Sequence, residues 1–324
     1  ERRSRQHRDP DRQLEALGLN ELRSTWVGQR LPLGRMREDR RAVLVAAVAE
    51  LPDGSLALAY FDDPGLNQFA IFLRRLDPTG RPLGLAVAVS EPIDEGFPDT
   101  PRLAVSARGD IALAWNLEIV GFVPFLRLEG DLHLPAVRFF DAALEPQTPV
   151  LRPAELQCKG NCQPDVAFSN TDAALVVWGG RLDEAGFEEI VGRRYDLDQG
   201  WLDAEPRRVA SSAAGDALRA PRIAPKRGSG GGWWLAWISD GTIFEPRTRA
   251  FVAALDGGFS LEPARSIVAL GDSVRLLTAP GLGTDIAGNA LAICAALPQI
   301  GLRRRVGHHP ALRAARPSPR CSLS

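Results

Sequence analysis

The chain has 324 residues, with 39 basic and 40 acidic side chains and a formal net charge of −1 at pH 7. A hydrophobic content of 45% excludes a wholly disordered chain, and the near-neutral charge argues against a nucleic-acid partner, which normally requires a clearly basic domain. No stretch reaches the roughly 18 apolar residues of a membrane-spanning helix, so we expect no membrane span.

The N-terminal stretch mixes arginine with aspartate and has no apolar face, so residues 1–25 are predicted to be a flexible segment. Residues 26–34 then resemble residues 80–84, whose composition is that of a turn before an outermost strand. We therefore expect the N-terminal region to supply the outer strand of the last repeat, which would cover an otherwise exposed sheet edge.

From residue 41 onward, short apolar runs end at an aromatic residue with a spacing that varies little. The four aromatic residues are separated by 55, 63 and 59 residues: Tyr60, Trp115, Trp178 and Trp237. A turn-forming residue lies six positions before each of them: Gly54, Gly109, Asp172 and Gly231. A fixed period of this length is the signature of a repeat architecture, and we expect the large aromatic side chains to fill the space between neighbouring sheets.

Further landmarks complete each repeat. A proline opens the run before the turn in three copies, at Pro101, Pro164 and Pro221, and a fifth copy begins at Pro280 with Cys294 in the aromatic position. Downstream, a third strand-like run ends at an acidic residue, which is Asp77, Asp141, Asp196 or Asp256 in the four complete copies. A short fourth run follows. Each copy thus has four strand-like runs joined by turns.

Four consecutive antiparallel strands are typical of a propeller blade, and a blade cannot bury both of its faces alone. We therefore predict an all-β chain, a β-propeller of about five four-stranded blades over residues 26–300, which an N-terminal strand would close. From Ile286 to the C-terminus there is no acidic residue, and residues 301–324 are predicted to be a disordered basic tail. A frameshifted reading frame would explain the same composition.

The four cysteines include one closely spaced pair. Cys158 and Cys162 bracket three residues that contain glycine and asparagine, so a tight turn can bring them within disulfide range. We predict a disulfide there, with two free thiols as the alternative, because the bond depends on an oxidising compartment. No metal site is expected, since His133, the one histidine within the repeats, has no partner at ligand spacing.

The repeat resembles that of secreted bacterial β-propeller repeat proteins, a family of unknown function. The shared order is a proline, a strand, Gly-Asp or Gly-Asn, an apolar strand ending in Trp, and an Arg-Arg-aromatic-Asp segment. The resemblance covers roughly residues 41–296. It implies an extracellular, periplasmic or cell-surface location and specifies no activity, because propellers host many chemistries. Neither a sialidase Asp-box nor a WD dipeptide is present within the repeats.

Two sets of loops are expected to meet at one end of the blades, namely the loops that enter each first strand and those that follow each aromatic residue. Ligands of propellers usually bind there. The candidate ligand-binding residues are therefore the polar side chains of these loops: Asp62, Asp63, Asp94, Glu95, Asn116, Glu118, Asp183 and Asp240.

From these residues we expect a non-catalytic binding or scaffold protein, exported, with an unknown protein or glycan as ligand and with no cofactor. The alternative is a glycan-directed hydrolase or lyase that uses the acidic residues of the loop face, because two carboxylates at a suitable separation suffice for glycoside hydrolysis. An inert structural member of a surface assembly is a third class. The sequence assigns no catalytic residue.

Overall fold

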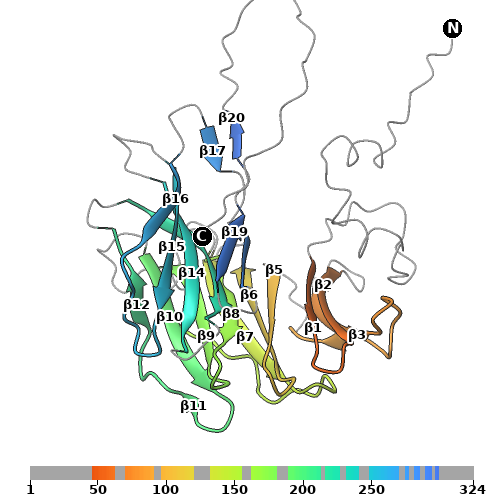
Figure 1. Cartoon of the computed structure of the whole chain (residues 1–324). Helices are drawn as coiled ribbons and strands as arrows, with labels where there is room; N and C mark the ends of the chain where they lie inside the picture. The colour runs from red at the N-terminus through yellow and green to blue at the C-terminus, as the bar shows by residue number, and fades with distance from the viewer. Residues whose placement is uncertain are drawn as a thin grey trace, which may run out of the picture. The chain divides into compact units, whose positions relative to one another are not determined.

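The computed structural model describes residues 46–62, 70–90, 96–119, 132–154, 162–180, 189–212, 216–226, 231–240, 248–269, 274–276, 281–284, 289–293 and 296–298. These residues form twenty β-strands and no helix, which confirms the all-β prediction (Figure 1). They belong to one unit, residues 41–300 with 320–324. The predicted N-terminal segment, residues 26–45 and the predicted tail lie outside the described residues.

Four successive antiparallel sheets correspond to the four complete sequence repeats. The first contains β1 (Ala46–Glu50), β2 (Leu56–Asp62), β3 (Ala70–Leu76) and β4 (Val87–Ala88). The second contains β5 (Gly96–Val105), β6 (Ile111–Ile119) and β7 (Leu132–Phe140). The third contains β8 (Asp165–Phe168), β9 (Ala174–Gly180), β10 (Glu189–Asp196), β11 (Gly200–Trp201) and β12 (Arg207–Ala210). The fourth contains β13 (Leu218–Pro225), β14 (Trp233–Ser239), β15 (Arg249–Leu255) and β16 (Arg265–Ala269).

The fifth repeat copy forms a shorter structure. Its first two strands are the hairpin β18 (Gly281–Thr284) and β19 (Ala290–Ile293). A separate pair joins β17 (Val274–Leu276) to β20 (Ala296–Pro298). Cys294, which the repeat places at the aromatic position, lies outside the described residues.

The turn residues inferred from the repeat adopt a left-handed backbone conformation. Gly54, Gly109, Asp172 and Gly231 have φ angles of 80°, 96°, 61° and 59°. This left-handed region favours glycine and tolerates asparagine and aspartate. Each residue therefore closes the hairpin between the first and second strands of its sheet, as the sequence predicts.

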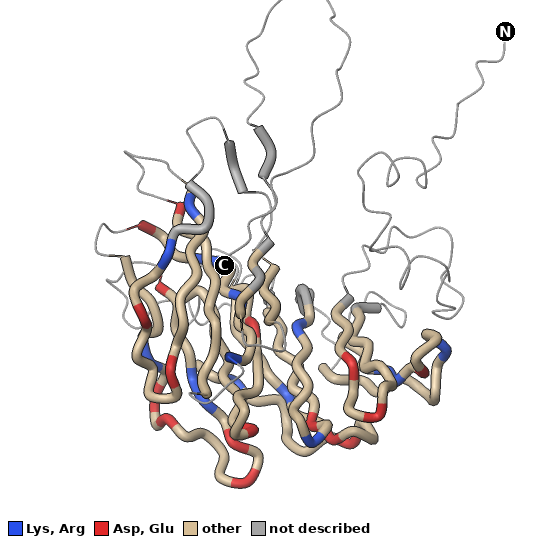
Figure 2. Tube along the Cα trace, in the orientation of Figure 1, with Lys and Arg blue, Asp and Glu red and all other residues tan. Residues whose placement is uncertain are grey.

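The acidic residue at the end of a third strand closes the next hairpin. Asp77 Oδ1 accepts hydrogen bonds at 2.8 Å from the backbone amides of Thr79 and Arg81. Asp141 and Asp256 accept from the amides two and four positions ahead in the same way. Figure 2 shows Asp and Glu, in red, at turns at the lower end of the sheets. Such side-chain caps satisfy backbone donors, so these three acids have a structural role in the turns.

Three hydrophobic cores lie between successive sheets, and each tryptophan anchor sits in one of them. Trp115 belongs to the core shared by the first and second sheets, Trp178 to that of the second and third, and Trp237 to that of the third and fourth. Their exposed fractions are 1%, 2% and 5%. The three tryptophans thus occupy equivalent places, which confirms the prediction that they are core residues.

Arginines of the third strands connect one sheet to another. Arg75 Nη1 donates to the carbonyl oxygen of Ala142 at 3.1 Å, from the first sheet to the second. Arg138 Nη1 donates back to the carbonyl oxygen of Val89 at 2.8 Å. Sheets one to four therefore form a continuous stack of modules. A closed ring of sheets is not seen in the described residues, so the number of blades and the closing N-terminal strand stay predictions.

Candidate functional site

The first strands of successive repeats lie next to one another. β1 contacts β5, β5 contacts β8, β8 contacts β13, and β13 contacts β18. A residue at one repeat position therefore approaches the residues at the same position in the neighbouring copies. Side chains from several sheets can therefore form one site along this line of strands.

One such position carries charge in three adjacent copies. It is the residue after the repeat proline, and it pairs across the hairpin with the residue before the aromatic anchor: Arg102 with Ala114, Asp165 with Val177, Arg222 with Ala236. We call Arg102, Asp165 and Arg222 the first-strand charge cluster. The same register places Ala47 opposite Ala59 in the first copy and Gly281 opposite Ile293 in the fifth. Those two copies contribute no side chain larger than a methyl group.

The backbone before the cluster is irregular. The pairing register shifts just before Arg102 and again just before Arg222, as it does at a β-bulge. Gln163 and Ala220, each followed by proline, have φ angles of 43° and 54°. A non-glycine residue before proline strongly disfavours this region. Bulges and strained residues of this kind gather at functional sites.

Asp165 is a buried carboxylate with 8% of its surface exposed. Its Oδ1 accepts a hydrogen bond from the amide of Val166 and its Oδ2 one from the amide of Ile223, both at 3.0 Å. Burial raises the pKa of Asp165 above its usual value, and the positive charges of Arg222 and Arg102 oppose that rise.

The two arginines have few partners among the residues that the structure describes. Arg222 is 8% exposed and donates from Nη1 to the carbonyl oxygen of Pro221 at 2.6 Å. Burial lowers the pKa of Arg222 to about 10; Asp165 opposes this change and Arg102 adds to it. Arg102 is half-buried and makes no hydrogen bond or ion pair with any residue that the structure describes.

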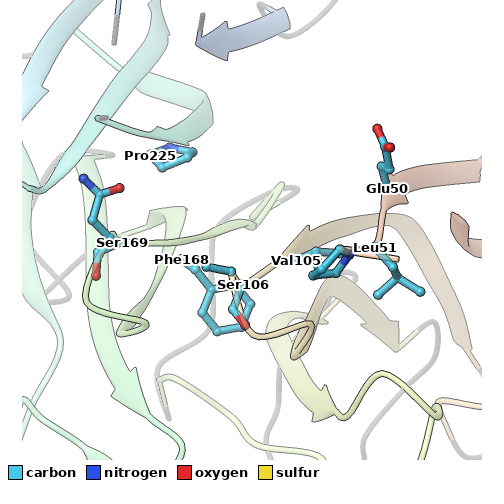
Figure 3. Close-up of a pocket in the computed structure, with 10 residues that line it drawn as sticks. Glu50, Leu51, Val105, Ser106, Phe168, Ser169 and Pro225 are labelled. Carbon is cyan, nitrogen blue, oxygen red and sulfur yellow. The ribbon is translucent and has the colours of Figure 1, made fainter. Parts of the chain in front are cut away.

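A pocket of about 670 Å³ opens at the turns that follow the first strands (Figure 3). Its walls come from the first to the fourth sheets and include Glu50, Ser106, Ser169 and Pro225. The serine hydroxyls are engaged within their own turns, Ser106 with Asp110 at 3.0 Å and Ser169 with Thr171 at 2.9 Å. The pocket thus offers space but little free hydrogen-bonding capacity.

Two predicted ligand-binding residues have described side chains, and both have structural partners. Asn116 lies inside β6, not in a loop, and is 1% exposed. Its Nδ2 lies 3.1 Å from His133 Nδ1, whereas its Oδ1 has no partner among the described residues. Asp240 follows β14 and forms a two-pronged ion pair with Arg219, with Oδ1 2.9 Å from Nη2. Both side chains therefore already contact other side chains of the protein.

The other six candidates have no described side chain. Asp62 and Glu118 lie at the ends of β2 and β6, with only their backbone described. Asp63, Asp94, Glu95 and Asp183 lie outside the described residues, so a convergence of these acids stays a prediction. Of the cysteine pair, Cys162 is fully buried and is not a free thiol. Cys158 lies outside the described residues, so their disulfide also stays a prediction.

Sequence reasoning missed the first-strand charge cluster as a site. Its signal is present: the residue after each repeat proline is charged in Arg102, Asp165 and Arg222, although the residues that follow are mostly apolar. In the described part of the chain, no group of three or more histidine, cysteine or acidic residues could hold a metal ion. The same part contains no helix able to cross a membrane.

Comparisons with known proteins give distant similarities only. No family model and no curated protein matches the sequence. An α-L-arabinanase from Penicillium chrysogenum, complexed with arabinobiose, is 14% identical with a TM-score of 0.49 and matches over 77% of this chain and 74% of its own. An ulvan lyase of polysaccharide lyase family PL25 is 8% identical with a TM-score of 0.48, over 77% of this chain and 61% of its own.

A protein of unknown function from Dyadobacter fermentans is 12% identical with a TM-score of 0.48, over 72% of this chain and 71% of its own. Two of these three structures, the arabinanase and the ulvan lyase, are of glycan-active enzymes. At such identities and TM-scores the similarities assign no activity to this chain.

Proposed function

We propose that the chain is a β-propeller of about five blades whose ligand site lies on the axis, at the first-strand charge cluster. The proposal is supported by the order of the sheets, by the equivalent places of Trp115, Trp178 and Trp237, and by the contacts between successive first strands. The hairpin of β18 and β19 supplies the inner part of the fifth blade. That the N-terminal region supplies the strand that closes the ring is part of the same proposal.

The protein is exported and is directed at a glycan, which it cleaves as a hydrolase or lyase. One observation carries this proposal: Asp165 is a buried carboxyl with a raised pKa, next to strained backbone at the repeat position where the first strands meet. A buried ion cluster contributes little to stability compared with apolar packing. A titratable group shifted by burial and by specific charges is instead typical of a functional site.

Catalysis would require a second group at the correct distance from Asp165. In hydrolysis by paired carboxylates, the two groups lie roughly 5 to 9.5 Å apart. The predicted loop acids Asp94, Glu95 and Asp183 are the residues we propose for this role. A raised pKa lets Asp165 remain protonated at a pH where an exposed acid is ionised, which suits a proton donor.

Non-catalytic binding is the second candidate, and one observation favours it. Both oxygens of Asp165 accept backbone hydrogen bonds, so its carboxyl is fixed in place. A group held in this way can orient a ligand without transferring a proton. Cleavage and non-catalytic binding would both take place at the first-strand charge cluster, and only cleavage would convert the glycan to product.

The test is a panel of plant, algal and bacterial polysaccharides, assayed for new reducing ends, for unsaturated products and for binding. We expect cleavage of at least one polysaccharide by the wild type, a large loss in Asp165→Asn, and full activity in Asp198→Asn, which removes an exposed turn acid. Binding without cleavage would support the second candidate. Absence of both binding and cleavage across the panel would refute a glycan-directed function.

A further inference from the structure

The first-strand charge cluster holds two guanidinium groups for one carboxylate. Arg102 and Arg222 lie on the strands that flank the strand of Asp165, and all three occupy the same repeat position. In the first and fifth copies this position holds Ala47 and Gly281, which bring no charge. The cluster therefore has an excess of positive charge in a partly desolvated place.

The described residues occupy little of the hydrogen-bonding capacity of these arginines. Each guanidinium has five N–H donors. Arg222 uses Nη1 for the carbonyl oxygen of Pro221, and Arg102 has no partner among the described residues. No hydrogen bond joins Asp165 to either arginine; its two oxygens accept from the backbone amides of Val166 and Ile223.

Two arginines of the third sheet, Arg193 and Arg194, behave differently. Arg194 uses Nε and Nη2 for the two oxygens of Asp203, at 3.0 and 2.7 Å, and Nη1 for the carbonyl oxygen of Gly257. Arg193 directs Nε, Nη1 and Nη2 to three backbone carbonyls. Arg193 and Arg194 thus direct their donors to protein acceptors, whereas Arg102 and Arg222 make at most one hydrogen bond with the residues that the structure describes.

We infer that Arg102 and Arg222 recognise an oxyanion on the glycan, so that the substrate class is acidic glycans that carry carboxylate or sulfate groups. This inference rests on the proposed glycan-directed function and specifies its substrate. A guanidinium fork matches the two oxygens of such a group and binds them through charge-assisted hydrogen bonds. A neutral sugar would leave the excess positive charge uncompensated.

The test measures binding of matched oligosaccharide pairs by calorimetry. One pair is oligogalacturonate and its carboxyl-reduced neutral form; the other is a sulfated galactan oligosaccharide and its desulfated form. The proteins are the wild type, Arg102→Gln, Arg102→Lys and the control Arg81→Gln, which removes an exposed arginine side chain outside the cluster. Thermal melting of each variant establishes that it is folded.

We expect the wild type to bind one acidic member more tightly than its neutral counterpart. Arg102→Gln should lose roughly tenfold to a hundredfold of that affinity, the range for a lost hydrogen bond to a charged group. Arg102→Lys should recover only part of it, and Arg81→Gln should keep it. The pair that shows the effect identifies carboxylate or sulfate as the recognised group.

Other outcomes separate this inference from the proposed function. Equal binding of acidic and neutral members would overturn the inference and leave the glycan-directed function standing, as would equal losses in Arg102→Gln and Arg81→Gln. If no oligosaccharide binds, free glucuronate and sulfate are tested by thermal shift. Protection that depends on Arg102 would then support oxyanion recognition while the glycan function fails, and no protection would overturn both.

Discussion

Asp165 Oδ2 accepts a hydrogen bond from the backbone amide of Ile223 at 3.0 Å, which ties the third sheet to the fourth through a buried carboxylate. The bond joins residues that are 58 positions apart in the sequence. The same carboxylate lies in the field of Arg102 and Arg222. One side chain thus contributes to the packing of two sheets and to the proposed ligand site.

The raised pKa of Asp165 predicts a specific dependence of stability on pH. Because the folded state holds this proton more tightly than the unfolded chain, whose carboxyl titrates near 3.8, raising the pH from about that value upward through the folded pKa destabilises the fold. Asp165→Asn removes this titration, so its free energy of unfolding should fall less over that range. Urea unfolding at a series of pH values measures this free energy for the wild type and the variant. The same pH dependence in both proteins would contradict the prediction.

Trp178 lies in the core between the second and third sheets with 2% of its surface exposed. Truncation by Trp178→Ala should lower the free energy of unfolding by about 3–5 kcal/mol, because it removes contacts and leaves a cavity. Leu85→Ala is the control, since Leu85 is 88% exposed and its truncation should change stability by less than about 0.5 kcal/mol. An unchanged unfolding midpoint for Trp178→Ala would show that the anchor does not support the core.

Two adjacent glycines in one turn should respond differently to alanine. Gly231 has a φ of 59° with no atom within 4 Å of an added Cβ. Gly231→Ala should therefore lower the free energy of unfolding by about 1 kcal/mol. At Gly232, with φ of 89°, the Cβ would lie 2.3 Å from the carbonyl oxygen of Leu255, and Gly232→Ala should cost about 3 kcal/mol. Thermal melting of the two variants side by side measures the difference, and equal losses would count against the described turn.

The predicted bond between Cys158 and Cys162 can be tested chemically. Protein purified from an exporting host should leave both cysteines unlabelled by an alkylating reagent after denaturation without reductant, and both should react once reductant is added. Peptide mass mapping distinguishes them from Cys294 and Cys321. Full labelling of Cys158 and Cys162 without reductant would argue against the disulfide and against export.

The parts of the fold that depend on local chemistry could be predicted from sequence. The turns at Gly54 and Gly109 and the caps at Asp77 and Asp141 are closed by atoms a few residues away, so spacing alone locates them. The tryptophan anchors follow from the repeat, because equivalent positions face equivalent neighbours.

The candidate site depends on relationships that spacing does not encode. The sequence predicts Asn116 after the end of a strand, but β6 continues to Ile119 because its pairing with β7 persists and the amide of Asn116 meets His133. The first-strand charge cluster requires knowing that first strands of different copies touch. Pairing of Asp240 with Arg219 likewise depends on two strands that meet only in the folded chain.

The capped hairpins at Asp77, Asp141 and Asp256 also bear on how the chain folds. Each is closed by contacts over four residues or fewer, and such hairpins form within microseconds, long before distant segments meet. A polypeptide that emerges one end first can therefore close the hairpin of each module as it appears. The earliest modules would then serve as a template on which the later ones assemble.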